Sequence, residues 1–347
     1  MAPLPSPGSA MTVLVTGGAG FIGSHTCADL LDHGHDVVIV DDHSNSSPGA
    51  LRALREVTRR ELAAYRADLR DDRALGEVFA RHPIDAVIHF AAKKVVPESV
   101  RIPLEYYSVN VGGTVSLLRV MREHAVRRLV FSSSCSVYGD QFGHPITEDE
   151  PPGPVNPYAR SKLVCEQVLA DACASDGGLS VIALRYFNPV GAHPSGGLGE
   201  EPRGAPRALM PCITQVAAGL AAELLVFGGD YPTPDGTAIR DYVHVMDVAG
   251  AHRVALAHID EQPGLRVRNI GTGAGTSVLQ MVAAFRDACG VHVPYVITPR
   301  RSGDVASLVA DASRAGREWG WRASRGLAEM CRDAWRFRLL HPKGYKG

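Results

Sequence analysis

The stretch TVLVTGGAGFIG at residues 12–23 decides the fold. Its first five residues are a short β-branched run of the kind that forms a buried strand, and the amphipathic stretch 21–33 follows as a helix. Between them, Gly17, Gly20 and Gly23 form a GxxGxxG turn, where bare backbone and the amino end of a helix can meet a diphosphate. This order is typical of the first unit of a dinucleotide-binding domain.

The same unit repeats outward from this stretch. Short β-branched runs alternate with longer amphipathic stretches, and this alternation predicts an α/β protein with a Rossmann-type, doubly wound parallel sheet. The predicted strands cover residues 12–16, 36–40, 64–67, 85–90, 128–132 and 180–186. The predicted helices include 21–33, 73–81, 104–123 and 158–176.

The regular alternation ends after Tyr186. The Gly/Pro-rich stretch 188–211 is too long for an ordinary connection and indicates a functional loop. A further strand at 242–245 and a helix at 248–258 are expected to return to the sheet. The predicted organisation is a disordered tail at 1–10, a cofactor domain over 11–187 to which 240–260 returns, and a smaller substrate lobe of 188–239 and 261–347.

Composition narrows the class of protein. The 347 residues carry a formal net charge of −1, so no broad positive field exists to hold nucleic acid or an anionic membrane. No run approaches the roughly 18 apolar residues of a membrane span. The seven cysteines contain no CxxC pair, which favours reduced thiols and no metal site. We expect a cytoplasmic protein.

An acidic residue completes the nucleotide signal. Asp41 lies 18 residues after Gly23 at the end of the second predicted strand, where a carboxylate can accept hydrogen bonds from the adenosine ribose. The following loop, 42–47, contains no arginine or lysine that could receive a 2′-phosphate. The sequence therefore favours NAD over NADP.

Tyr158 and Lys162 are the candidate chemical groups. They are four residues apart in a predicted helix and therefore share one face. A phenol with a pKa near 10 becomes a useful base only beside positive charge, here Lys162 and the nicotinamide ring. Ser134, which follows the fifth strand, could share the substrate proton. The alternatives are an exposed tyrosine–lysine pair without chemistry and a serine that caps a turn.

Residues 16–23, 132–134 and 158–162, in this order, resemble the extended short-chain dehydrogenase/reductase family. The resemblance implies a seven-stranded Rossmann sheet with a C-terminal α/β substrate lobe. Four longer stretches resemble the branch of that family that epimerises UDP-hexoses: GSHT at 23–26, SVYGDQ at 136–141, LRYFNPVGAHP at 184–194 and RDYVHV at 240–245.

This resemblance implies reversible, NAD-dependent C4 epimerisation of UDP-glucose and UDP-galactose through a 4-keto intermediate, as in galactose metabolism. Tyr158 would take the C4 hydroxyl proton while hydride moves to NAD, and the hydride would return to the other face of the sugar. Members of the family are usually homodimers, and the resemblance implies contact through the helices at 104–123 and 158–176.

The resemblance also implies the residues of the site. The implied catalytic residues are Tyr158, Lys162 and Ser134. Around NAD it implies Gly17, Gly20, Phe21, Ile22, Gly23, Asp41, Asp42, Asn45, Ser46, Asp68, Leu69, Phe90, Ala91, Ala92, Lys94, Asn110, Ser132, Tyr158, Lys162 and Phe187. Around the UDP-sugar it implies Lys94, Ser134, Tyr158, Asn188, Leu209, Phe227, Arg240, Tyr242, Arg301, Asp304 and Leu308. Two arginines suit a diphosphate, because guanidinium donors match phosphate oxygens.

Two departures keep alternatives open. Ala208 stands where the family often has an asparagine that holds the sugar nucleotide. Leu308 stands at a wall where tyrosine accompanies plain hexoses and small residues admit N-acetylated ones, so epimerisation of UDP-N-acetylglucosamine and UDP-N-acetylgalactosamine is an alternative. A 4,6-dehydratase needs an Asp-Glu pair where Cys135 and Ser136 stand. An NAD(P)H-consuming reductase and a non-catalytic NAD-sensing protein complete the alternatives.

Overall fold

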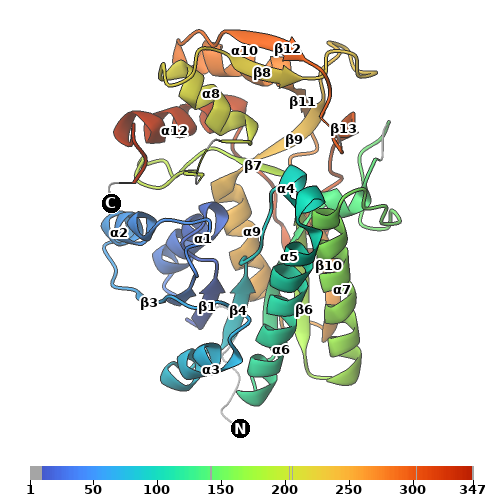
Figure 1. The fold of residues 1–347 in the computed structure, drawn as a ribbon. Helices are drawn as coiled ribbons and strands as arrows, with labels where there is room; N and C mark the ends of the chain where they lie inside the picture. The colour runs from blue at the N-terminus through green and yellow to red at the C-terminus, as the bar shows by residue number, and fades with distance from the viewer. Residues whose placement is uncertain (1–9, 141–142, 203, 205, 302, 346–347) are drawn as a thin grey trace.

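The computed structural model describes residues 10–140, 143–202, 204, 206–301 and 303–345. Residues 1–9 of the expected tail, and Gln141 of the motif at 136–141, lie outside the described residues. Seven parallel strands form the large sheet in the order β10-β6-β5-β4-β1-β2-β3, which confirms the predicted α/β class (Figure 1). These strands are β1 (Thr12–Thr16), β2 (Asp36–Val40), β3 (Ala63–Tyr65), β4 (Ala86–His89), β5 (Arg128–Ser134), β6 (Ser180–Tyr186) and β10 (Gly264–Ile270).

Helices cover both faces of this sheet. Successive strand residues point to opposite faces, so Val13 and Val15 pack in one apolar cluster and Leu14 in another. The first cluster takes in α1 (Phe21–Asp32), α2 (Pro48–Thr58) and α9 (Val245–Ala257). The second takes in α3 (Asp72–Arg81), α6 (Gly113–Glu123) and α7 (Pro157–Ser175). Two such layers are what a doubly wound sheet requires.

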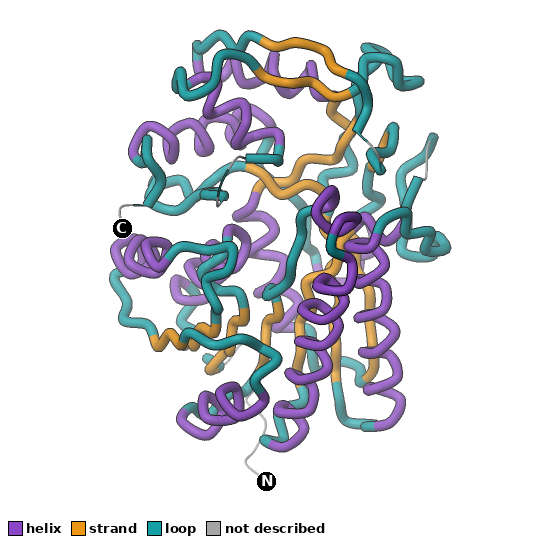
Figure 2. Tube along the Cα trace, viewed as in Figure 1, coloured by secondary structure: helices purple, strands orange, loops and turns teal. Residues whose placement is uncertain are grey.

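The small lobe stands at the carboxyl ends of the large sheet, above it in Figure 1. One small sheet joins β7 (Asn188–Val190), β9 (Ile239–His244), β11 (Gly275–Ser277) and β13 (Ser307–Leu308), and β8 (Leu224–Phe227) pairs with β12 (Tyr295–Thr298). The helices α8 (Leu209–Ala217), α10 (Val278–Cys289) and α12 (Leu327–Leu340) share a separate apolar cluster. Figure 2 shows loops between this lobe and the sheet.

Two strands differ from the prediction. The strand expected at 242–245 was predicted to return to the large sheet, but β9 belongs to the small one, because a β-branched run predicts a strand without naming its partner. The seventh strand of the large sheet is instead β10, within the stretch 261–347 that we predicted for the lobe. Its sequence, GLRVRNI, alternates apolar residues with Arg266 and Arg268, as suits an edge strand with one polar face.

The helix predicted at 104–123 is divided. α4 (Val96–Arg101) and α5 (Pro103–Tyr106) precede a π-helical segment, η1 (Tyr107–Gly112), which leads into α6. Such wide turns often occur at functional sites. Here η1 carries Asn110, one of the predicted cofactor residues. A short 3-10 turn, η2 (Cys135–Tyr138), follows β5, and α11 (Ser313–Trp319) packs beside β10.

Candidate functional site

The glycine turn has no room for side chains. Gly17 has a φ of +70°, its N–H donates to the Val40 carbonyl at 2.7 Å, and an added Cβ would lie 2.7 Å from the Ala91 nitrogen. A Cβ on Gly23 would lie 2.3 Å from the Gly17 oxygen. Gly20 is the N-cap of α1 and provides no side-chain cap. The first N–H groups of α1 are therefore suited to an anion, and the turn fits a dinucleotide diphosphate.

Asp41 is held beside that turn. Its carboxylate is buried, and one oxygen accepts the Ala19 N–H at 3.0 Å. The other oxygen accepts the His43 N–H at 2.9 Å and the Ser46 hydroxyl at 2.7 Å. A carboxylate has about four acceptor sites, so capacity remains for a ribose hydroxyl. Asp42 and Asn45, also predicted at the cofactor, are exposed in the same loop.

The predicted residue Asn110 is fully engaged by the chain. Its side-chain oxygen accepts the Lys93 N–H at 2.8 Å, and its amide donates to the Lys93 carbonyl at 3.0 Å and the Ser161 hydroxyl at 2.9 Å. Asn110 thus fixes the loop after β4, which contains Phe90, Ala91, Ala92 and Lys94. Lys94 forms an ion pair with Glu200 of the small lobe at 3.2 Å.

The remaining predicted cofactor residues lie in several settings. Asp68 pairs with Arg70 at 2.6 Å, and hydrogen bonding from Arg70 holds the pKa of this carboxyl below its usual range. Leu69 and Phe187 are buried, and Phe21 and Ile22 are half-buried in the first turn of α1. Side-chain contacts do not connect all of these residues. Their membership of one site therefore stays a prediction.

Tyr158, Lys162 and Ser134 meet where α7 crosses the end of β5; we call them the Tyr–Lys–Ser cluster. Asn156 caps α7 by accepting the Ala159 N–H at 2.9 Å, which sets Tyr158 in the first helical turn. One turn later, the buried Lys162 ammonium donates to the Ser132 carbonyl at 2.6 Å.

The electrostatics of this cluster are set by burial. Burial raises the pKa of Tyr158 to about 12, and the hydrogen bond with Ser134 opposes that rise. Burial lowers the pKa of Lys162 to about 8. The spacing predicted an ammonium that lowers the phenol pKa, whereas Lys162 donates to a backbone carbonyl. The chain's own groups therefore leave the phenol protonated at neutral pH.

The prediction from sequence missed two buried charged groups behind the cluster, Glu166 and Arg185. Glu166 accepts two hydrogen bonds from Arg185, at 2.9 and 2.5 Å, and one from the Ser133 hydroxyl at 2.5 Å. The Tyr186 hydroxyl donates to the Ser132 hydroxyl. Glu166 lies four residues after Lys162, so helical spacing could have placed it on the same face. No local signal points to Arg185.

Three predicted substrate residues lie together in the small lobe. The Arg301 guanidinium stacks over the Phe227 ring at 4.5 Å and donates to the Asp304 carboxylate at 3.0 Å. The side-chain oxygen of Asn188 is buried without a hydrogen-bond partner in the described part of the chain, as suits a group that receives a ligand. Tyr242 is buried on β9.

Arg240 and Leu308 connect this lobe to the Tyr–Lys–Ser cluster. Burial raises the pKa of the Cys135 thiol to about 12, and the Arg240 guanidinium opposes that rise. Arg240 is the register partner of Leu308 in the pairing of β9 with β13. Leu308 packs in one apolar cluster with Cys135 and Phe187.

The departure at Ala208 has a structural consequence. Ala208 is the N-cap of α8, and it makes no side-chain hydrogen bond to the first turn. The predicted substrate residue Leu209 follows it, half-buried. An asparagine here would satisfy a helix N–H, so its absence leaves the start of α8 unsupported.

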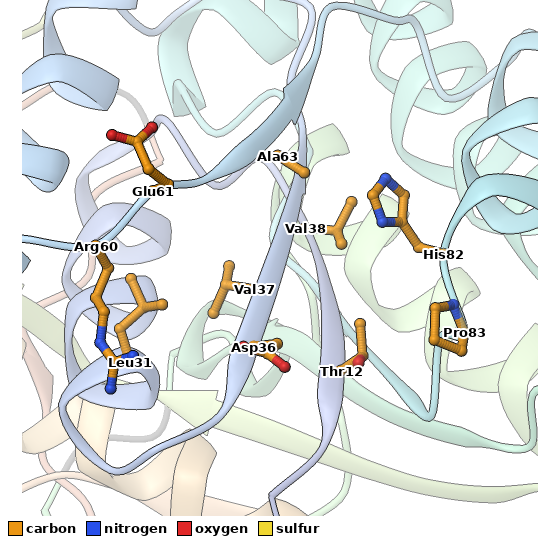
Figure 3. A pocket seen from close by; sticks show the side chains of 10 residues that line it. All are labelled: Thr12, Leu31, Asp36, Val37, Val38, Arg60, Glu61, Ala63, His82 and Pro83. Atoms are coloured by element: carbon orange, nitrogen blue, oxygen red, sulfur yellow. The ribbon is translucent and has the colours of Figure 1, made fainter.

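A separate hollow of about 410 Å³ lies at the amino ends of β1 and β2, away from the carboxyl ends where the predicted site lies (Figure 3). Thr12 and Asp36, the first residues of β1 and β2, line it together with Arg60, Glu61 and His82. Sites of open α/β sheets form at the carboxyl ends of the strands, so we assign this hollow no part in the site.

Among its described residues, the chain has neither a metal-binding cluster nor a membrane-spanning helix. No cluster of three or more histidines, cysteines or acidic residues there could hold a metal ion. None of the helices in that part of the chain combines the length and the apolar character that crossing a membrane requires.

Comparison with known proteins confirms the resemblance. Residues 13–271 match the model of the NAD dependent epimerase/dehydratase family. A UDP-glucose 4-epimerase of Bacillus subtilis is 52% identical over 336 residues, covering 97% of this chain and 99% of that protein. The crystal structure of UDP-glucose 4-epimerase from Bifidobacterium longum with NAD+ and UDP has a TM-score of 0.94 and 48% identity, covering 96% of this chain and 100% of that one. The corresponding Stenotrophomonas maltophila enzyme, with bound NAD and formylated UDP-arabinopyranose, has a TM-score of 0.93 and 49% identity, covering 96% and 99%. This chain therefore belongs to the NAD-dependent epimerase/dehydratase family.

Proposed function

We propose that this chain is a UDP-glucose 4-epimerase, which interconverts UDP-glucose and UDP-galactose with NAD as its resident cofactor. The observation that carries the proposal is the Tyr–Lys–Ser cluster, at the carboxyl end of β5, beside a glycine turn at the carboxyl end of β1. Only β4 separates these two strands in the sheet. The near full-length similarity to UDP-glucose 4-epimerases of several organisms supports the same reaction.

The residues at the glycine turn would hold NAD. Gly17, Gly20 and Gly23 admit its diphosphate to the amino end of α1, and Asp41 accepts a hydrogen bond from the adenosine ribose. When bound, NAD supplies an acceptor and donor of hydride and a positive charge near the phenol. The other residues implied by the resemblance, from Phe21 to Phe187, complete the proposed site.

Tyr158 would move the proton. Its phenolate accepts the C4 hydroxyl proton as the C4–H bond breaks, and the phenol gives that proton back to the oxygen when hydride returns. Ser134 would donate a hydrogen bond to the two oxygens that exchange this proton, the C4 oxygen and the Tyr158 oxygen, and so keep the path of the proton short. Lys162, charged below its pKa of about 8, supports the phenolate through a positive charge one helical turn away.

Arg240 and Arg301 would bind the UDP diphosphate, since each presents a guanidinium on the small lobe. Asn188 would accept a hydrogen bond from the sugar nucleotide through its unpartnered side-chain oxygen, and Phe227 and Leu209 would cover the uracil. Leu308 would form the wall beside the hexose. Because leucine lies between tyrosine and small residues in size, slower epimerisation of N-acetylated UDP-sugars is the alternative within this same reaction.

We propose further that two copies associate in the cytoplasm. Val100 on α4, Ile102 between the two helices and Leu104 on α5 are 59%, 41% and 82% exposed, and both helices pack next to α7. Exposed apolar patches commonly mark interfaces. Light scattering should give the mass of two chains, and Leu104→Glu should shift it toward one.

One experiment tests the reaction. The purified protein is incubated with UDP-galactose without added cofactor, the sugar product is identified, and NAD is assayed after denaturation. We expect UDP-glucose as the product, stoichiometric NAD, and turnover that is about 10²–10⁴ lower in Tyr158→Phe. A 4-keto-6-deoxy product would indicate a dehydratase, net cofactor oxidation a reductase, and no turnover with NAD present a non-catalytic NAD-binding protein.

A further inference from the structure

Asp241 is a buried carboxylate whose acceptor capacity is filled by other segments of the small lobe. It follows Arg240 on β9 and is 0% exposed. One oxygen accepts the Thr272 N–H at 2.9 Å and the Thr272 hydroxyl at 2.6 Å. The other accepts the Gly273 N–H at 2.9 Å and the Ala310 N–H at 3.1 Å. Asp241 thus ties β9 to the turn before β11 and to the residue two positions after β13.

The packing around this carboxylate is close. A Cβ added to Gly271 would lie 2.6 Å from an Asp241 oxygen and 2.6 Å from the Ala310 Cβ. The segments of Asp241, Gly271 and Ala310 therefore pack so closely that only a glycine fits at position 271. A buried acceptor in such a place is costly to remove, because its donors would stay buried without partners.

The Ala310 hydrogen bond matters most, because β13 is short. Only Ser307 and Leu308 pair with β9, in a register that sets Leu308 opposite Arg240. Two paired residues give little cooperative support, so the position of β13 also depends on the residues that follow it. There the Ala310 N–H donates to Asp241 on one side, and on the other side Ile146 forms a bridge, in which its N–H donates to the Val309 carbonyl and its carbonyl accepts the Asp311 N–H, both at 2.8 Å. On its other side, Leu308 packs in the apolar cluster of Cys135, which follows Ser134.

Arg240 and Leu308 are therefore neighbours across the pairing of β9 with β13, and Leu308 packs with Cys135, the residue after Ser134 of the Tyr–Lys–Ser cluster. The Arg240 charge reaches Cys135, and its guanidinium also donates to the Ile239 carbonyl at 2.8 Å. We propose that Asp241 is a positioning residue that sets how far Arg240 and Leu308 stand from the cluster, and so limits the size of the sugar that reaches Tyr158. This rests on the proposed UDP-hexose reaction.

The test is Asp241→Asn. An amide nitrogen cannot accept, so it faces N–H groups that lose their acceptor. We expect the KM for UDP-galactose and the calorimetric Kd for UDP each to rise about tenfold, with kcat changed less than about threefold, since the reacting groups are untouched. The kcat/KM preference for UDP-galactose over UDP-N-acetylgalactosamine should fall about tenfold. Thr272→Val removes the hydroxyl that donates to Asp241 and also accepts the Ala274 N–H at 3.1 Å, while the Thr272 N–H still donates to Asp241. It should shift the KM, the Kd for UDP and the substrate preference by about threefold each, and it covers the case in which Asp241→Asn does not fold.

Asp247→Asn is the matched control. Asp247 is also buried and accepts four hydrogen bonds, from the Ser324 N–H and hydroxyl at 3.0 and 3.1 Å and from the Arg325 N–H and guanidinium at 3.0 and 2.5 Å. It lies on α9 and supports a different segment. This variant should lose a similar amount of thermal stability while its Kd for UDP and its substrate preference stay at wild-type values.

Equal shifts in both variants, or a lowered kcat with an unchanged KM in Asp241→Asn, would overturn the proposal. So would wild-type affinity and preference in Thr272→Val. If the wild-type protein shows no epimerase turnover, the proposed function fails, whereas the comparison of UDP affinities between the two aspartate variants still decides the role of Asp241.

Discussion

Glu166 and Arg185 form a buried ion pair whose removal should be among the costliest single changes in the molecule. Their side chains are 5% and 6% exposed, and Arg185 donates two hydrogen bonds to Glu166 at 2.9 and 2.5 Å. Glu166→Ala leaves the guanidinium buried without a counter-charge, which costs about 3–5 kcal/mol. It also leaves the Ser133 hydroxyl unsatisfied, which adds about 1 kcal/mol or more. We expect a total near 5 kcal/mol, measured by urea unfolding at a fixed, saturating NAD concentration.

The double variant Glu166→Met with Arg185→Met separates this explanation from simple loss of packing. Replacing both charges with apolar side chains of similar length removes the buried unpaired charge, so it should recover at least about 2 kcal/mol relative to Glu166→Ala. Glu77→Ala is the control, because Glu77 is 52% exposed on α3 and its partners Arg73 and Arg81 are 91% and 60% exposed, so no buried charge is left unpaired. That change should cost about 1 kcal/mol or less. A loss below 1 kcal/mol for Glu166→Ala, or a double variant less stable than it, would refute the reasoning.

Four further outcomes are expected. Gly23→Ala should lose bound NAD on gel filtration, because its Cβ would lie 2.3 Å from the Gly17 oxygen. Tyr158→Phe should bind UDP with wild-type affinity in calorimetry while kcat falls by about 10²–10⁴. Because burial lowers the pKa of Lys162 from 10.5 to about 8, kcat should fall as pH rises through 8, whereas the contribution of this group to the free energy of unfolding should increase between pH 8 and 10.5, where only the unfolded chain holds the proton. Ala208→Asn should raise stability by about 1 kcal/mol in urea unfolding, since it caps α8.

Local signals predicted most of the large sheet. The strands at 12–16, 36–40 and 180–186 have the predicted bounds, because each is an apolar run closed by turn residues. The edge strand β10 was not predicted, because Arg266 and Arg268 alternate with its apolar residues and interrupt the apolar run. The π-helical segment η1 was not predicted either, because residue propensities do not distinguish a wide turn from an α-helical one.

In the candidate site too, the parts that depend on neighbouring residues in the chain were predicted, and the contacts between distant residues were not. The glycine turn and the start of α7 depend on neighbours in the chain, so the motifs contained what was needed. Glu166, Arg185 and Asp241 meet partners that are far away in sequence, and no periodicity announces such pairs. The Tyr–Lys spacing fixed a shared helix face but not the acceptor of the ammonium, which is the Ser132 carbonyl.

That acceptor changes how the phenol must be activated. With the pKa of Lys162 near 8 and that of Tyr158 near 12, both groups hold their protons at pH 7, so the charged lysine alone is not enough to make a base. Burial is the main reason for both shifts, and it also lowers the effective dielectric around the phenol. Coulomb energies grow as the effective dielectric falls, so one added positive charge near Tyr158 acts on its pKa more strongly here than on an exposed tyrosine. In the proposed reaction, the apolar setting that makes the resting phenol a weak acid would therefore make its ionisation depend on the cationic ring of bound NAD, and would couple the proton-accepting form of Tyr158 to the presence of a hydride acceptor.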